Sequence, residues 1–246
     1  MLTDEQLKNL DIQGHLIIED ALSTDQVTEL KEQSLELAAN EREDSGKYVY
    51  LDEKSQRVWN LINKGKIFEE VIQHPDVMHG MEHLLDADFV LSSFTVNRIG
   101  PGSPAGGLHI DYPLSAMPTP IPTFAISANS VFFLDDFTIE NGGTFVIPGS
   151  HRWGFGPSHR PDFQPQGKIQ ATGPAGTIML VHGHIWHGSA PNQTDADRVG
   201  LLGFFCRSFM KPQQDQLKLV DQEIIDNAEP QMRRLLGLDC QPNLND

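Results

Sequence analysis

The chain has 246 residues, of which 39% are hydrophobic, and a formal net charge of −16. This length favours a single large domain, and the apolar content excludes wholesale disorder because enough apolar surface exists to offset the entropy of ordering. The balance of 34 acidic against 18 basic residues argues against a nucleic-acid or anionic-membrane surface, since both need clustered Lys and Arg.

The cysteines and the opening residues indicate a compartment. Two cysteines, Cys206 and Cys240, do not make a disulfide framework. The first residues show neither the basic nor the apolar region of a signal peptide, and no apolar run approaches the ~20 residues of a membrane span. We therefore expect a cytoplasmic protein without a membrane partner, and the sequence leaves the oligomeric state open.

Helical signals dominate residues 1–87. Thr3 with Gln6, and Ser23 with Gln26, have the spacing of capping boxes, in which a hydroxyl and a Gln side chain satisfy free backbone N–H groups. Each pair predicts the start of a helix.

Two short segments and a further helix complete this region. Residues 15–18, His-Leu-Ile-Ile, predict a short strand, and the polar residues 40–56 predict a loop. Pro75 marks the start of an amphipathic helix. Its apolar side chains recur at helical spacing, at Val77, Met78, Met81, Leu84 and Leu85.

From residue 88 the signals become those of strands. Runs rich in β-branched and aromatic residues, separated by Gly, Pro, Asn and Asp clusters, fall at residues 89–96, 131–134, 144–147, 177–181 and 199–205. Many short strands of this kind predict a sandwich or barrel. The tail after Pro212 turns polar and helical. We expect one domain over residues 1–246, with a helical layer (about 1–87), a β core (about 88–210) and a helical tail.

His-x-Asp, a spacing that can put both side chains on one side of a strand, occurs twice. The pattern is expected about once by chance in a chain of this composition. His74-Pro-Asp76 stands where a helix is predicted to begin, and Pro and Asp are typical of that position. His109-Ile-Asp111 follows a glycine-rich stretch that allows close approach of a ligand. The pair alone is equally compatible with a metal site and with an ordinary polar pair.

A second cluster holds His182, His184 and His187 within six positions, just after a predicted strand. Two imidazoles and one carboxylate presented on a barrel form the triad typical of non-haem Fe(II), which leaves three coordination positions open. Zinc more often closes its shell tetrahedrally.

Longer motifs carry a family resemblance. They are His109-Ile-Asp111, Glu140-Asn-Gly-Gly-Thr-Phe-Val-Ile-Pro-Gly-Ser-His151, His187-Gly-Ser-Ala-Pro-Asn192 and Arg198. With them the sequence resembles the phytanoyl-CoA dioxygenase family of Fe(II)/2-oxoglutarate-dependent oxygenases, from residue 2 to about 207. The resemblance implies a double-stranded β-helix, a jelly-roll or cupin-like core, with helices packed on one face.

The resemblance also implies the metal ligands. His109 and Asp111 match the proximal pair, and His187 matches the distal ligand because it begins His-Gly-Ser. His182 and His184 do not fit that slot, so we expect them behind the ligands or in the pocket wall. His151 belongs to the family pattern but receives no role.

Three residues are expected at the co-substrate. Arg198 would bind the far carboxylate of 2-oxoglutarate, since a guanidinium matches a carboxylate with two parallel hydrogen bonds. Thr144 and Asn97 would offer a hydroxyl and an amide to the same molecule. An ordinary structural role for either polar side chain stays open.

The implied reaction uses Fe(II), 2-oxoglutarate and O₂, with ascorbate supporting activity, and releases succinate and CO₂ while a C–H bond of a small-molecule metabolite is hydroxylated. Related halogenases have a small residue in place of the carboxylate ligand, whereas this chain keeps Asp111. The alternatives are desaturation, epimerisation or cyclisation by the same oxidising centre. A metal-binding cupin-like isomerase or a non-catalytic binding barrel also stays open.

Overall fold

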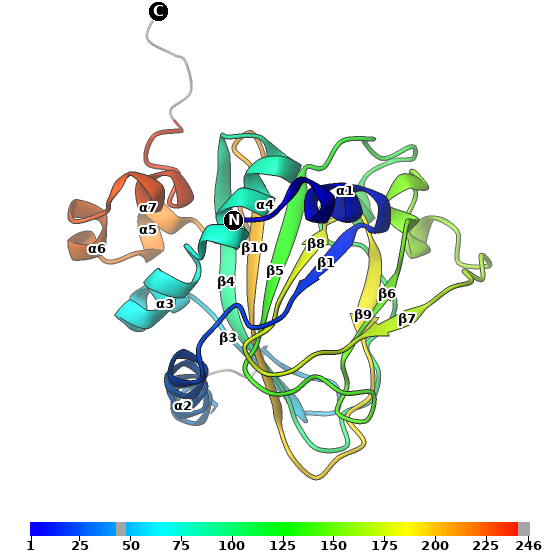
Figure 1. Cartoon of the computed structure of the whole chain (residues 1–246), viewed down its shortest axis with the longest axis horizontal. Coiled ribbons are helices and arrows are strands. Elements are labelled where there is room, and N and C mark those ends of the chain that lie inside the picture. The colour runs from blue at the N-terminus through cyan, green and yellow to red at the C-terminus, as the bar shows by residue number, and fades with distance from the viewer. Residues whose placement is uncertain (43–47, 241–246) are drawn as a thin grey trace, which may run out of the picture.

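The computed structural model describes residues 1–42 and 48–240 and contains two antiparallel sheets. The strand order of the seven-stranded sheet is β1 (His15–Ile18), β8 (Ile178–His182), β5 (Ser127–Phe133), β10 (Arg198–Arg207), β4 (Phe89–Ile99), β3 (Ser55–Val58) and β2 (Val49–Tyr50). The three-stranded sheet has the order β7 (Ile169–Ala171), β6 (Thr144–Ile147) and β9 (Trp186–Ser189). In Figure 1 the small sheet lies on one side of the large sheet, and most helices lie on the other.

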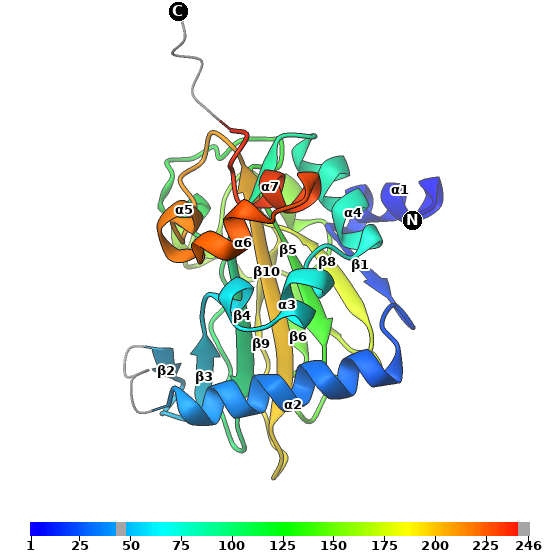
Figure 2. The same cartoon turned by 90° about the vertical axis from the view of Figure 1, so that its left-hand side faces the viewer.

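Helices cover the outer face of the large sheet, as Figure 2 shows for α2, α3, α6 and α7 in front of β4 and β10. The helices are α1 (Asp4–Gln13), α2 (Thr24–Asn40), α3 (Lys66–Val71), α4 (Pro75–Leu85), α5 (Gln216–Leu219), α6 (Gln222–Asp226) and α7 (Pro230–Leu235). Their apolar side chains and those of the sheet's outer face form one buried core. Among the described residues, no helix is both long and apolar enough to cross a membrane.

The alternation of side chains along β10 separates this core from the inner cavity. Val199 and Leu201 point outward into the core under the helices, whereas Arg198, Leu202 and Phe204 line the cavity. A strand directs successive side chains to opposite faces. One strand therefore helps build both the stable core and the site. The two facing sheets form the jelly-roll that the sequence predicts.

Most predicted elements lie where the sequence places them. All five predicted strands of the β core are present, with ends that differ by a few residues, and so is the strand at residues 15–18. Both capping boxes form, because Thr3 Oγ1 and Ser23 Oγ each accept the backbone N–H three residues later, at 3.3 Å. His74 caps α4, its Nδ1 accepting from the Asp76 N–H at 3.3 Å, so this His-x-Asp is a helix start.

The prediction of a loop over residues 40–56 is wrong for part of that segment, of which residues 43–47 lie outside the described structure. β2 and β3 extend the large sheet there. The sequence of β3 lacks an apolar signal because two of its buried side chains, Ser55 and Gln56, are polar and satisfied by hydrogen bonds. Ser55 Oγ lies 2.9 Å from Ser103 Oγ, and Gln56 Nε2 donates to the Ala38 carbonyl at 2.8 Å.

The N-terminal layer is consequently not only helical. It contributes β1 at one edge of the large sheet and β2 with β3 at the other. β7 and β9 were not predicted from the sequence, and they are only three and four residues long. β9 matters most, since it carries a candidate metal ligand.

Candidate metal centre

A cavity of about 270 Å³ lies between the two sheets. Inward-facing side chains of β4, β5, β8 and β10 form one wall, and β9 with the segment after Gly106 forms another. Except for His182 and His184, every residue to which the sequence analysis assigns a role at the site lines this cavity. They are Asn97, His109, Asp111, Thr144, His187 and Arg198.

His109, Asp111 and His187 meet at one point of the cavity. One ligand atom from each lies within 4.8 Å of the others. His187 Nε2 is 3.6 Å from Asp111 Oδ1, and the two imidazole centroids are 4.4 Å apart. No other group of three His, Cys, Asp or Glu side chains in the described residues meets this criterion. Two imidazoles and one carboxylate suit Fe(II).

Backbone carbonyls set the orientation of both imidazoles. His109 Nδ1 lies 2.9 Å from the Gly107 oxygen, and His187 Nδ1 lies 3.0 Å from the Ile185 oxygen. A carbonyl oxygen only accepts hydrogen bonds, so each Nδ1 carries the proton and each Nε2 keeps a free lone pair. Metal-binding imidazoles are commonly fixed in this way.

Electrostatics keep His109 neutral. The residue as a whole is exposed, but removal of water from around its ring lowers the pKa of His109. The neighbouring His187 lowers that pKa further. A neutral imidazole is the form that binds a metal ion.

The backbone and Asn129 hold the triad together. His109 and His187 form an isolated antiparallel bridge, in which each N–H donates to the other's carbonyl at 2.9 Å. Asn129 Nδ2 donates to Asp111 Oδ2 at 2.6 Å. Asp111 therefore keeps Oδ1 directed toward His187, where a metal would bind.

Arg198 is a buried cation without a carboxylate partner among the described residues. It is 2% exposed, and its Nε has no hydrogen-bond partner. The guanidinium carbon lies 4.2 Å from the centroid of the Phe137 ring. Burial lowers the pKa of Arg198 to about 10, and nearby Tyr50 and Asp135 oppose that shift. The group stays charged at neutral pH, and a buried unpaired charge is costly, so the site favours an anionic ligand.

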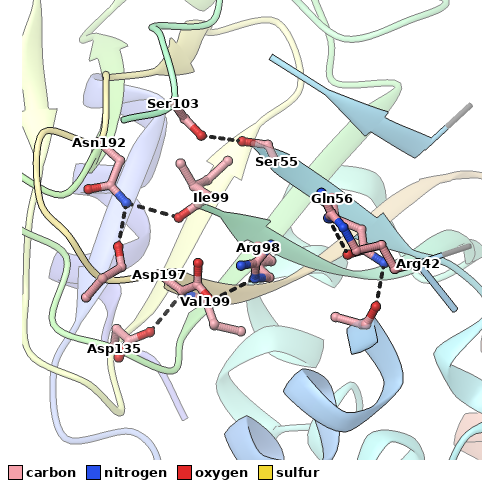
Figure 3. Close-up of polar contacts among 12 residues, drawn as sticks. Arg42, Ser55, Gln56, Arg98, Ile99, Ser103, Asp135, Asn192, Asp197 and Val199 are labelled. Atoms are coloured by element: carbon pink, nitrogen blue, oxygen red, sulfur yellow. Dashed lines mark hydrogen bonds and ion pairs between the residues drawn. The ribbon is translucent and has the colours of Figure 1, made fainter. Parts of the chain in front are cut away.

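Bonds made by the neighbours of Arg198, drawn in Figure 3, fix the chain around the start of β10, where Arg198 lies. Asp197 Oδ2 accepts from Arg98 Nε at 2.7 Å, and Asp135 Oδ2 accepts from the Val199 N–H at 2.8 Å. Asn192 closes the preceding loop by donating to the Ile99 carbonyl at 3.0 Å. Asp197 is thus engaged with the Arg98 side chain and Asp135 with the Val199 backbone, and neither carboxylate pairs with the Arg198 guanidinium.

Thr144 and Asn97 both line the cavity, from β6 and β4. Asn97 Oδ1 accepts a hydrogen bond from the Tyr50 hydroxyl, so this amide oxygen already has a partner. No hydrogen bond of the Thr144 hydroxyl occurs among the described residues. Five further residues line the cavity without a role predicted from the sequence: Tyr50, Arg57, Ser93, Asn129 and Gln213. Tyr50 falls in the predicted loop, Ser93 in a predicted strand and Gln213 in the predicted helical tail. Arg57 and Asn129 lie outside every predicted element.

The remaining histidines of the cluster lie elsewhere. His182 and His184 are buried and do not line the cavity. Of the two places expected for them, the pocket wall is therefore wrong, and the place behind the ligands stays a prediction. His182 packs against His151, with ring centroids 4.8 Å apart. His151 Nε2 bonds the Asp11 carbonyl at 3.0 Å, which ties the loop after β6 to α1.

Known proteins share this sequence pattern and fold. The sequence matches the phytanoyl-CoA dioxygenase (PhyH) family over residues 10–200. It is 28% identical to dioxygenase ALT11 of Alternaria alternata over 97% of this chain and 82% of that protein. The chain spans 58% of the length of a second fungal dioxygenase.

Two solved structures are similar in fold. EctD from S. alaskensis with bound Fe superimposes with a TM-score of 0.69, at 21% identity over 86% of this chain and 80% of that chain. HygX from Streptomyces hygroscopicus with nickel and 2-oxoglutarate bound gives 0.67, at 16% identity, covering 90% and 95%.

The chain belongs to the phytanoyl-CoA dioxygenase family, which confirms the resemblance noted in its sequence. The similar structures confirm the jelly-roll fold, and at these identities they carry no more than the fold. The predicted class of enzyme, an oxygenase, is that of the family and of its named relatives.

Proposed function

We propose that the protein is an Fe(II)/2-oxoglutarate-dependent dioxygenase that hydroxylates a C–H bond of a small-molecule metabolite. One observation carries the proposal: the His109–Asp111–His187 triad and the unpaired, buried Arg198 line the same cavity. The triad suits a metal ion and the arginine suits an anion. Fe(II) and 2-oxoglutarate together supply both.

Each residue has a role that its contacts support. His109 and His187 would bind iron through Nε2, and Asp111 through Oδ1, while Asn129 holds the other carboxylate oxygen. Arg198 would bind the far carboxylate of 2-oxoglutarate. When bound, the iron with 2-oxoglutarate and O₂ supplies the oxidising power, and the protein supplies orientation and a shielded cavity.

Two further cavity residues complete the co-substrate site. The Thr144 hydroxyl, which has no hydrogen-bond partner among the described residues, would donate a hydrogen bond to 2-oxoglutarate. Asn97 is held by Tyr50 through its oxygen, so its NH₂ group is the part left for a ligand. Both side chains would orient the co-substrate.

The test is succinate release from 2-oxoglutarate by purified protein with Fe(II), ascorbate and air. We expect iron-dependent release that is lost in Asp111→Ala and in Arg198→Ala. A metal-binding isomerase or a non-catalytic barrel predicts no dependence on 2-oxoglutarate. Mass spectrometry of the product separates hydroxylation, which adds one oxygen atom, from desaturation, which removes two hydrogens, and from epimerisation, which leaves the mass unchanged.

A further inference from the structure

A second arginine lines the metal cavity and has no role in the proposed function. Arg57 extends from β3 into the cavity and is partly buried. Among the described residues, no carboxylate, carbonyl or aromatic ring pairs with its guanidinium. Two nearby arginines differ: Arg42 donates to the Glu53 carbonyl at 3.0 Å, and Arg98 pairs with Asp197 at 2.7 Å. An arginine left unpaired inside a cavity indicates an anionic ligand.

Register places Arg57 apart from the co-substrate arginine. Arg57 lies opposite Asn97, and Arg198 lies opposite Ile99, so β4 separates the two arginines. Two strand spacings put their backbones roughly 10 Å apart. Arg57 lines the same cavity as the metal ligands His109 and Asp111. A ligand bound to Arg57 would therefore share the cavity with the metal site, where a substrate must present its reacting C–H bond.

The positive charge of Arg57 has no opposite charge to balance it once Fe(II) and 2-oxoglutarate are bound. The two positive charges of Fe(II) and the one of Arg198 are matched by Asp111 and the two carboxylates of 2-oxoglutarate. Arg57 then adds one positive charge to the cavity of a chain whose net charge is −16. One further negative charge would neutralise the loaded site.

The remaining lining indicates what carries that charge. Met179, Val181, Leu202 and Phe204 give the cavity an apolar wall. A single guanidinium matches one carboxylate through two parallel hydrogen bonds, whereas a phosphate dianion would leave a charge unpaired.

Resting on the proposed function, we infer that the primary substrate is a small carboxylic acid with an apolar body, and that its carboxylate pairs with Arg57. Arg57 is thus a specificity-determining residue.

Ser93 Oγ donates to Gln213 Oε1 at 2.7 Å, which joins the segment after β10 to the same cavity wall.

The experiment uses straight-chain and aromatic monocarboxylic acids as probes, each paired with its methyl ester and primary amide. The readout is succinate release above the background without probe, in the wild type, Arg57→Gln, Arg57→Lys and Arg42→Gln. Arg42 is the matched control, because it bonds Gln56, which neighbours Arg57 on the same strand and points to the opposite face.

We expect acids of suitable length to stimulate wild type and Arg42→Gln at concentrations about 30-fold or more below their neutral partners. Arg57→Gln should abolish this difference, and Arg57→Lys should keep part of it. Equal stimulation by esters and amides, no stimulation by any acid in the wild type, or an unchanged acid preference in Arg57→Gln would overturn the inference.

Two measurements separate this inference from the proposed function. Arg57→Gln should raise the KM for 2-oxoglutarate much less than Arg198→Ala does. If the wild type releases no succinate under any condition, the proposed function fails. If Arg57→Gln raises the KM for 2-oxoglutarate as strongly as Arg198→Ala does, Arg57 serves the co-substrate and the substrate inference fails alone.

Discussion

Two groups of histidines in this chain differ in whether their surroundings leave a ring nitrogen available to a metal ion. His109 and His187 each bond a backbone carbonyl through Nδ1 and point Nε2 toward a shared carboxylate. His182 and His184, only five and three residues before His187, are buried outside the cavity and share no carboxylate with a third ligand. A metal site therefore needs oriented lone pairs and a common anion, and clustering of imidazoles alone does not make one.

The buried group has the properties of core residues. Neither ring nitrogen of His184 has a hydrogen-bond partner among the described residues, and this side chain is 1% exposed. Burial lowers the pKa of His182 to about 2 and the pKa of His184 to about 4. These imidazoles stay neutral and contribute packing, whereas those of the triad keep one nitrogen for a ligand.

Removing the common anion should have the largest effect. In Asp111→Ala we expect loss of tight Fe(II) binding and of hydroxylation, because a direct ligand matters at least as much as outer residues that already cost ~10–100-fold. We expect no efficient halogenation in chloride, since chloride also needs a pocket that positions it to about 0.5 Å. Mass spectrometry of the products is the measurement. Abundant chlorinated product, or wild-type hydroxylation, would contradict this account of Asp111.

The anion site should come next. Arg198→Ala should weaken 2-oxoglutarate binding by roughly 2–5 kcal/mol, by analogy with buried charge pairs, and leave metal binding in place. Arg198→Lys should restore only part, because an ammonium lacks the planar fork. Calorimetric titration with 2-oxoglutarate in the presence of Fe(II), without oxygen, measures the 2-oxoglutarate affinity of both variants. Unchanged affinity in the alanine variant would place the anchor elsewhere.

A smaller effect is expected at Asn129, which contacts the metal ligand Asp111 and not the metal itself. Asn129→Ala removes the donor to Asp111 Oδ2 and should reduce Fe(II) affinity by about 10–100-fold, because the carboxylate loses its fixed orientation. Ser130→Ala is the control, since Ser130 neighbours Asn129 on β5 and does not line the cavity. Equal metal affinities in the two variants would show that Asn129 does not orient Asp111.

The smallest effect concerns the buried histidines and pH. The folded-state pKa of His182 lies below its unfolded value near 6.5, so its contribution to stability is complete above about pH 6.5 and falls as the pH drops toward about 2. His182→Asn should remove a stability slope of up to about 1.4 kcal/mol per pH unit. Urea unfolding between about pH 7 and pH 5 measures it. A variant with the wild-type slope would show that His182 is not buried as a neutral group.

Local signals allowed much of the fold to be predicted. The capping pairs of α1 and α2 act within four residues, and the apolar runs of β4, β5 and β10 show in composition alone. β3 begins with Ser-Gln-Arg, not with the apolar run by which the other strands were predicted, and its hydrogen-bonded pairing with β4 places it in the sheet. Its place in the sheet depends on contacts distant in the sequence.

The candidate site divides in the same way. Motif residues such as His109 and Arg198 could be named from the sequence because they belong to a shared pattern. Asn129 and Arg57 could not, because only the packed sheet shows that they face the cavity and what they touch. Gln213 reaches the cavity through its bond to Ser93, 120 residues away in sequence.

The comparison between the two histidine groups is tested most directly by anaerobic titration of the protein with Fe(II) in the presence of 2-oxoglutarate. The measurement is the visible charge-transfer absorption of the complex. We predict saturation at one Fe(II) per chain, loss of the band in His187→Ala and its retention in His184→Ala. Loss of the band in His184→Ala with retention in His187→Ala would contradict the assignment of the metal centre.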